Sequence, residues 1–73
     1  MDINVEEKLQ LVLQGKLTFT SGNLAFNMLI NKLKRKVSED PACIADCIRE
    51  IDEFGSKYPK VVATDFAVIA GLQ

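Results

Sequence analysis

The 73-residue sequence contains no histidine. Histidine is the most common general base in enzymes and the most common metal ligand in proteins. Its absence removes the usual nucleophile–base pairs, so an enzyme is the least favoured class of function. We expect a non-enzymatic protein that has no catalytic residue, no cofactor and no metal ion.

Long apolar runs are also missing from the sequence. The longest uncharged apolar stretch is too short to cross a lipid bilayer. The first eight residues, MDINVEEK, carry acidic side chains where a secretory signal peptide has a basic start and an apolar stretch. We therefore expect a cytoplasmic protein that has no membrane partner.

Cysteine is scarce, with Cys43 and Cys47 the only two, and they lie four residues apart. Two cysteines cannot build a disulfide framework, and a zinc site would need two further ligands from carboxylates or from a second chain. A redox pair usually has two intervening residues rather than three. We predict reduced, metal-free thiols that are partly or wholly buried at the edge of a core, although oxidation could link two chains.

The composition that remains is that of a small globular protein, with 48% hydrophobic and 26% charged residues. A chain of this length forms one domain, residues 1–73, whose single core provides only modest stability. Small domains often gain stability by association, and the mean hydropathy of +0.10 places some apolar side chains near the surface. We therefore expect a homodimer or a protein partner.

Hydrophobic residues recur every three or four positions in two segments of the N-terminal half, which predicts two helices. The first begins at Asn4 as its N-cap and ends at Gly15 in a left-handed conformation. The second begins with Thr20 or Ser21 as its N-cap and ends near Val37. The residues predicted to face the core are Val5, Leu9, Val12 and Leu13 in the first helix, and Phe26, Leu29, Ile30, Leu33 and Val37 in the second.

A third helix is predicted to follow Asp40, which is a good N-cap before Pro41 at the first helical position. It is predicted to end at Gly55. Its core-facing residues are Ile44, Cys47, Ile48, Ile51 and Phe54.

Two further segments are less regular. Residues 16–20 read as a loop that inserts Leu17 and Phe19 into the core, or as a minor strand. Residues 60–72 suit either a helix or a short strand, and a helix is favoured because no sheet is predicted upstream for a strand to join. The predicted fold is an all-α, small compact bundle of three helices plus an uncertain fourth C-terminal helix or short strand.

The second helix has two apolar sides. Leu24 and Met28 lie nearly opposite Phe26 and Ile30 at about 100° per residue. Either the C-terminal segment covers this side within the chain, or a second copy or another protein does. We predict that Leu24 and Met28 bind a partner, so that the chain is a small protein-interaction or regulatory module.

Charge is distributed unevenly along the chain. Residues 16–37 contain five basic residues and no acidic one, whereas residues 38–55 contain six acidic residues and one arginine. Two helices of opposite charge that attract each other explain this pattern, and we favour that interpretation. The alternative is a nucleic-acid-associated protein, which would use Lys32, Lys34, Arg35 and Lys36 together with Asn27 and Asn31.

Two features argue against nucleic-acid binding. The helix-turn-helix pattern fits poorly, because Gln10, Gln14 and Ser21 occupy positions that should be apolar. The isoelectric point is about 5.2, whereas dedicated nucleic-acid binders are usually basic. The hypothesis loses its main support if the basic residues pair with acids of the third helix.

Asp65 is the one acidic residue in an apolar C-terminal segment. We predict that it caps a last short helix together with Thr64, or pairs with a lysine.

Overall fold

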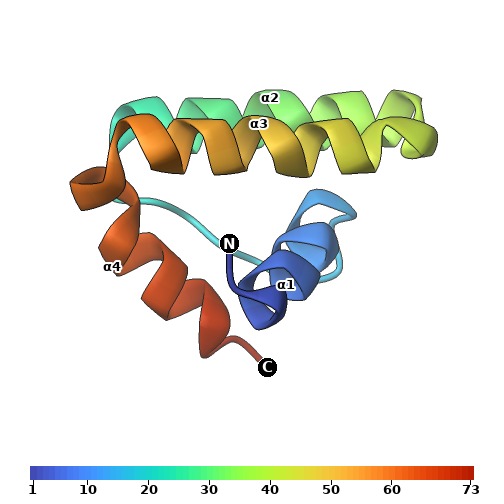
Figure 1. The fold of residues 1–73 in the computed structure, drawn as a ribbon. Helices are drawn as coiled ribbons and strands as arrows, with labels where there is room; N and C mark the ends of the chain where they lie inside the picture. Colours follow the sequence, from blue (N-terminus) through green and yellow to red (C-terminus); the bar gives the residue numbers. More distant parts are fainter.

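The computed structural model describes residues 1–73 and is entirely helical, with no strand. The chain forms α1 (Ile3–Leu13), α2 (Leu24–Glu39), the short 3-10 turn η1 (Pro41–Cys43), α3 (Ile44–Lys57) and α4 (Pro59–Ala70). α2 and α3 lie antiparallel in one layer, and α1 and α4 lie beneath that layer (Figure 1). The all-α prediction is confirmed, and the ambiguous C-terminal segment is a helix.

The first helix begins earlier than predicted, because Asp2 rather than Asn4 is its N-cap. The Asp2 carboxylate accepts a hydrogen bond from the Asn4 N–H at 2.7 Å. Asn4 instead donates its side-chain amide to the carbonyl of Ala70 at 3.1 Å. The Lys8 ammonium donates to the carbonyl of Leu72 in the same region. These two contacts hold the C-terminal end of α4 against α1.

The predicted left-handed residue at the end of α1 is confirmed. Gly15 has a φ of 77°, which a residue with a Cβ rarely adopts. The Lys16 N–H donates to the carbonyl of Leu11 at 2.8 Å, as in a Schellman motif. After this turn the chain runs as a loop rather than a strand, and Leu17 and Phe19 pack against the core.

The second helix is capped by Asn23, so the prediction of Thr20 or Ser21 as its N-cap is wrong. The side-chain oxygen of Asn23 accepts a hydrogen bond from the Phe26 N–H at 3.0 Å. Ser21 lies too far upstream, and its hydroxyl accepts from the Asn23 N–H at 2.9 Å. α2 also continues two residues beyond the predicted end at Val37.

The start of the third helical segment follows the prediction. The Asp40 carboxylate accepts a hydrogen bond from the Ala42 N–H at 3.2 Å, and Pro41 occupies the first helical position. The first turn has 3-10 geometry and leads directly into α3. Asp40 and Pro41 therefore separate α2 from α3.

Gly55 does not end α3, contrary to the prediction, because the helix continues to Lys57. A Cβ atom at Gly55 would lie 3.4 Å from the ring of Phe66 and 3.4 Å from a methyl group of Val62. Gly55 therefore faces α4 from inside α3, and a Cβ there would make ordinary van der Waals contact with α4. The residue does not reverse the chain.

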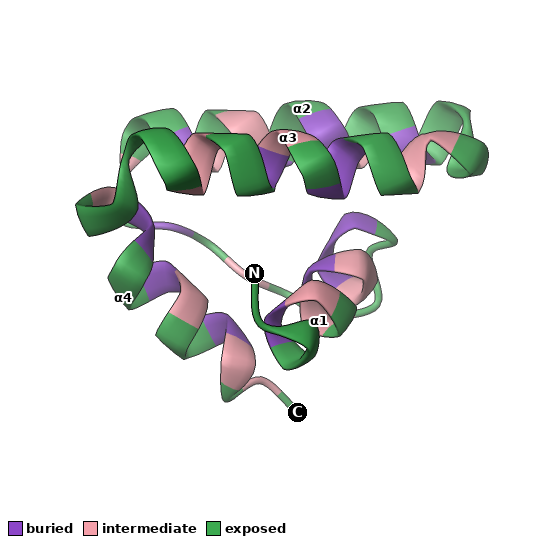
Figure 2. Ribbon diagram, viewed as in Figure 1, coloured by how far each residue is buried: buried purple, intermediate pink, exposed green.

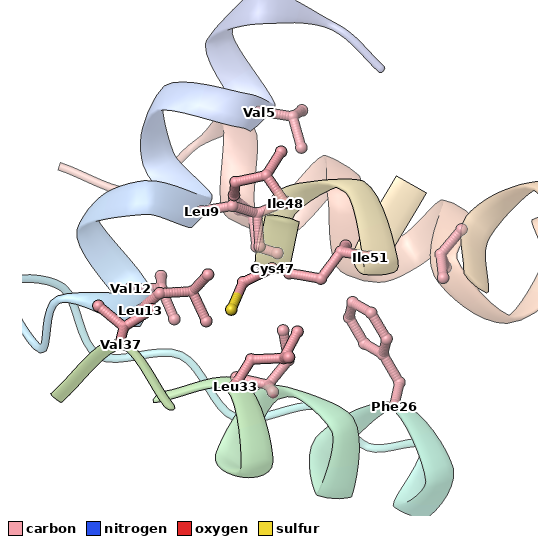
Figure 3. Packing of buried hydrophobic residues seen from close by; sticks show 13 residues of the cluster. Val5, Leu9, Val12, Leu13, Phe26, Leu33, Val37, Cys47, Ile48 and Ile51 are labelled. Carbon is pink, nitrogen blue, oxygen red and sulfur yellow. The ribbon is translucent and has the colours of Figure 1, made fainter. Parts of the chain in front are cut away.

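All four helices contribute to one hydrophobic core, and every α-helix directs its buried side inward (Figures 2 and 3). The predicted core-facing residues are buried or half-buried. The 13 buried members are Val5, Leu9, Val12, Leu13, Phe26, Ile30, Leu33, Val37, Cys47, Ile48, Ile51, Val62 and Ile69.

Candidate protein-binding surface

Leu24 and Met28 lie on the outer side of α2, where they are 74% and 62% exposed. We call these two residues the α2 apolar face. α4 packs beside α1 and α3 and lies on the other side of the α2–α3 layer (Figure 1). The alternative that the C-terminal segment covers Leu24 and Met28 is therefore wrong, and no part of the chain shields them.

Further apolar surface lies where the C-terminal end of α3 meets the N-terminal end of α2. Tyr58 is 48% exposed, and its ring packs on that of Phe54 with 5.0 Å between centroids. Leu29 and Phe54 are half-buried and line a shallow groove together with Tyr58. The rest of the groove is polar, and its lining includes the acidic residues Glu50, Asp52 and Glu53. The sequence alone does not identify Tyr58 as part of this surface, because a tyrosine directly before a proline is typical of a turn.

Two of the four cations in the basic cluster pair with one acid of α3. The Lys32 ammonium lies 3.6 Å from one carboxylate oxygen of Glu50, and the Lys36 ammonium lies 3.5 Å from the other. The lysine side chains are about half exposed, so each pair contributes less than about 1 kcal/mol. Lys34 and Arg35 form no salt bridge. This pairing favours attraction between oppositely charged helices over a nucleic-acid site.

The asparagines beside the basic cluster have local structural roles. Asn23 caps α2, and the side-chain oxygen of Asn27 accepts a hydrogen bond from the Ser21 N–H at 3.1 Å. Asn31 is exposed and makes no hydrogen bond through its side chain. Of the two asparagines proposed to contact nucleic acid, Asn27 is thus already engaged.

Ser21 and Asp65 form a buried polar pair between the α1–α2 loop and α4. The Ser21 hydroxyl donates to the Asp65 carboxylate at 2.6 Å, and the two residues are 7% and 8% exposed. The prediction that Asp65 caps a helix with Thr64 or pairs with a lysine is wrong. Asp65 lies inside α4 on its buried side. The hydrogen bond links the α1–α2 loop to α4.

The cysteine thiols lie side by side at the start of α3. Their sulfur atoms are 3.7 Å apart, Cys47 is buried and Cys43 is half-buried, as predicted. Burial, reinforced by the neighbouring Cys43 thiol, raises the pKa of Cys47 from the ordinary 9.0 to about 11. No cluster of three or more potential metal ligands forms around them.

This environment predicts unequal thiol reactivity. At pH 8, Cys43 is expected to react with iodoacetamide at least about tenfold faster than Cys47, because the raised pKa and burial deprive Cys47 of reactive thiolate. Peptide mapping after timed quenching measures both rates, and the Cys43→Ser variant isolates Cys47. Equal rates in the folded protein would contradict the assignment. In denaturant the two rates should converge.

We compared the chain with known protein families, curated proteins and solved structures. No protein-family model, curated protein or solved structure matches the chain. None of the helices is both long enough and apolar enough to span a membrane.

Proposed function

We propose that this chain is a non-enzymatic interaction module that binds another protein, or a second copy of itself, through the α2 apolar face. The observation that carries the proposal is the exposure of Leu24 and Met28, at 74% and 62%, on a helix whose opposite side already fills the core. A single exposed leucine is ordinary on a protein surface. Two large apolar side chains that are both exposed and lie one helical turn apart on the same side of a helix form a small apolar surface that suits a partner.

The rigidity of α2 supports this proposal. Asn23 caps the helix, and four side chains on its other face are buried. The apolar face is therefore held in place before a partner arrives. Because the backbone of α2 is already helical, a partner does not have to order it, which lowers the entropic cost of binding.

Replacing Leu24 and Met28 with aspartate should abolish association while leaving the fold intact. Both side chains are exposed, so the free energy of unfolding should change by less than about 1 kcal/mol. Circular dichroism reports helicity and melting. Sedimentation of the pure chain reports self-association, and co-purification from cells of the source organism reports a partner.

A matched control introduces the same two negative charges elsewhere. Thr18→Asp with Ala45→Asp alters exposed positions outside the α2 apolar face and should leave association unchanged. Equal association of all three proteins would refute the proposal. Unfolding of the Leu24→Asp/Met28→Asp variant would instead show that these side chains belong to the core.

A further inference from the structure

We infer that the partner of the α2 apolar face is an acidic amphipathic helix of another protein, rather than a second copy of this chain. The inference rests on the proposed function and specifies the chemistry of the partner. It follows from the charge along the outer side of α2 and from the contacts that two copies of α2 would make with each other.

The α2 apolar face continues along the helix as a straight stripe. Leu24, Met28, Asn31 and Arg35 follow one another at intervals of four, three and four residues, and all four are exposed. These intervals place the side chains on one line, as in the seam of a coiled coil. The stripe is about 16 Å long at 1.5 Å per residue, so a partner helix of about three turns covers it.

The stripe changes character from apolar to cationic. Leu24 and Met28 occupy its N-terminal half, and Arg35 lies at its C-terminal end without a salt bridge. The nearby Lys32 and Lys36 share the single carboxylate of Glu50, so positive charge remains in excess around Arg35. A partner that fits this stripe places apolar side chains over one end and carboxylates over the other.

A second copy of α2 fits the stripe in neither orientation. In a parallel pair, Arg35 would face Arg35 of the second copy, and two like charges would be brought together. In an antiparallel pair, Leu24 would face Arg35, and Met28 would face Asn31. Either arrangement buries a charged or polar group without a partner, which costs free energy.

The available area also favours a single helix. The exposed apolar surface of Leu24 and Met28 is on the order of a few hundred Å². A standard interface buries roughly 800 Å² on each partner. One amphipathic helix lying along the outer side of α2 needs less area, since it binds through a few anchors one or two turns apart.

Two designed helical peptides test the inference by fluorescence anisotropy. They share leucines at the seam positions and differ only at the end that faces Arg35, where one carries glutamates and the other lysines. The glutamate peptide is expected to bind at least about tenfold more tightly, and the difference should shrink as the salt concentration rises. The Arg35→Glu variant should reverse the preference, and Leu24→Asp/Met28→Asp should bind neither peptide.

The outcomes separate this inference from the proposed function. Equal binding of both peptides, tight self-association through α2, or failure of both peptides to bind the wild-type chain overturns the acidic-helix inference. Displacement of the glutamate peptide by a random-sequence DNA duplex also overturns it. The proposed function itself fails if Leu24→Asp/Met28→Asp alters neither peptide binding nor any association of the wild-type chain.

Discussion

Replacing Phe26 with alanine is expected to leave the domain largely unfolded at 25 °C. The Phe26 side chain is fully buried, and its ring lies 6.5, 5.4 and 6.2 Å from the rings of Phe19, Phe54 and Phe66. Removing such a ring costs about 3–5 kcal/mol, because transfer energy is lost and a cavity remains. A single core in a chain of this size rarely provides more than about 3–5 kcal/mol.

Urea unfolding followed by circular dichroism measures the effect of this substitution. Phe26→Leu keeps most of the buried volume and should fold with reduced stability. Leu24→Ala changes an exposed residue of the same helix and should stay near the wild type. A Phe26→Ala protein that melts within a few degrees of the wild type would mean that the aromatic cluster is not the centre of the core.

The second large effect is expected from Ser21→Ala. The substitution removes the hydroxyl that donates to Asp65 at 2.6 Å, and a buried carboxylate is left without that hydrogen bond. It also removes the acceptor of the Asn23 N–H at the start of α2. An unsatisfied buried polar group costs about 1–3 kcal/mol, and more when it is charged.

A double-mutant cycle separates the hydrogen bond from these other losses. If Ser21 and Asp65 act as a pair, the free-energy changes of Ser21→Ala and Asp65→Ala should not add, and the coupling energy should be about 0.5–3 kcal/mol. Strictly additive effects would contradict a stabilising link between the α1–α2 loop and α4.

The helices were predictable because the spacing of hydrophobic residues directly reflects burial on one side. The caps were less predictable, since several neighbouring polar residues can each cap a helix. Asn4 and Ser21 are suitable caps by type, but they contact α4 in the folded chain. Asp2 and Asn23 cap the helices instead. Hydrogen bonds to residues far away in the sequence engage Asn4 and Ser21, and no local sequence pattern predicts such hydrogen bonds.

Contacts between segments that are distant in sequence also determine the roles of Gly55 and Asp65. A glycine late in a helical pattern usually marks the end of the helix, but Gly55 faces α4 at close range. Asp65 lies on the buried side of its helix, where it accepts a hydrogen bond from Ser21 in a distant loop. Both roles depend on how helices pack together, which the sequence of one segment does not specify.

The candidate surface was predictable in part. The spacing along the second helix places Leu24 and Met28 opposite the core, and both are exposed. Whether another segment covers them depends on where α4 packs, so the sequence left both alternatives open. The opposite charges of α2 and α3 likewise predict that the two helices attract each other. Only the structure shows that Lys32 and Lys36 share the carboxylate of Glu50.

Photo-crosslinking in cells of the source organism tests most directly whether the α2 apolar face contacts a partner. A photoreactive phenylalanine analogue replaces Met28 in one variant and Thr18 in another, both exposed in the free chain. We predict that illumination produces one discrete adduct from position 28 and none from position 18. The absence of an adduct at position 28, or equal labelling at both positions, would contradict the account.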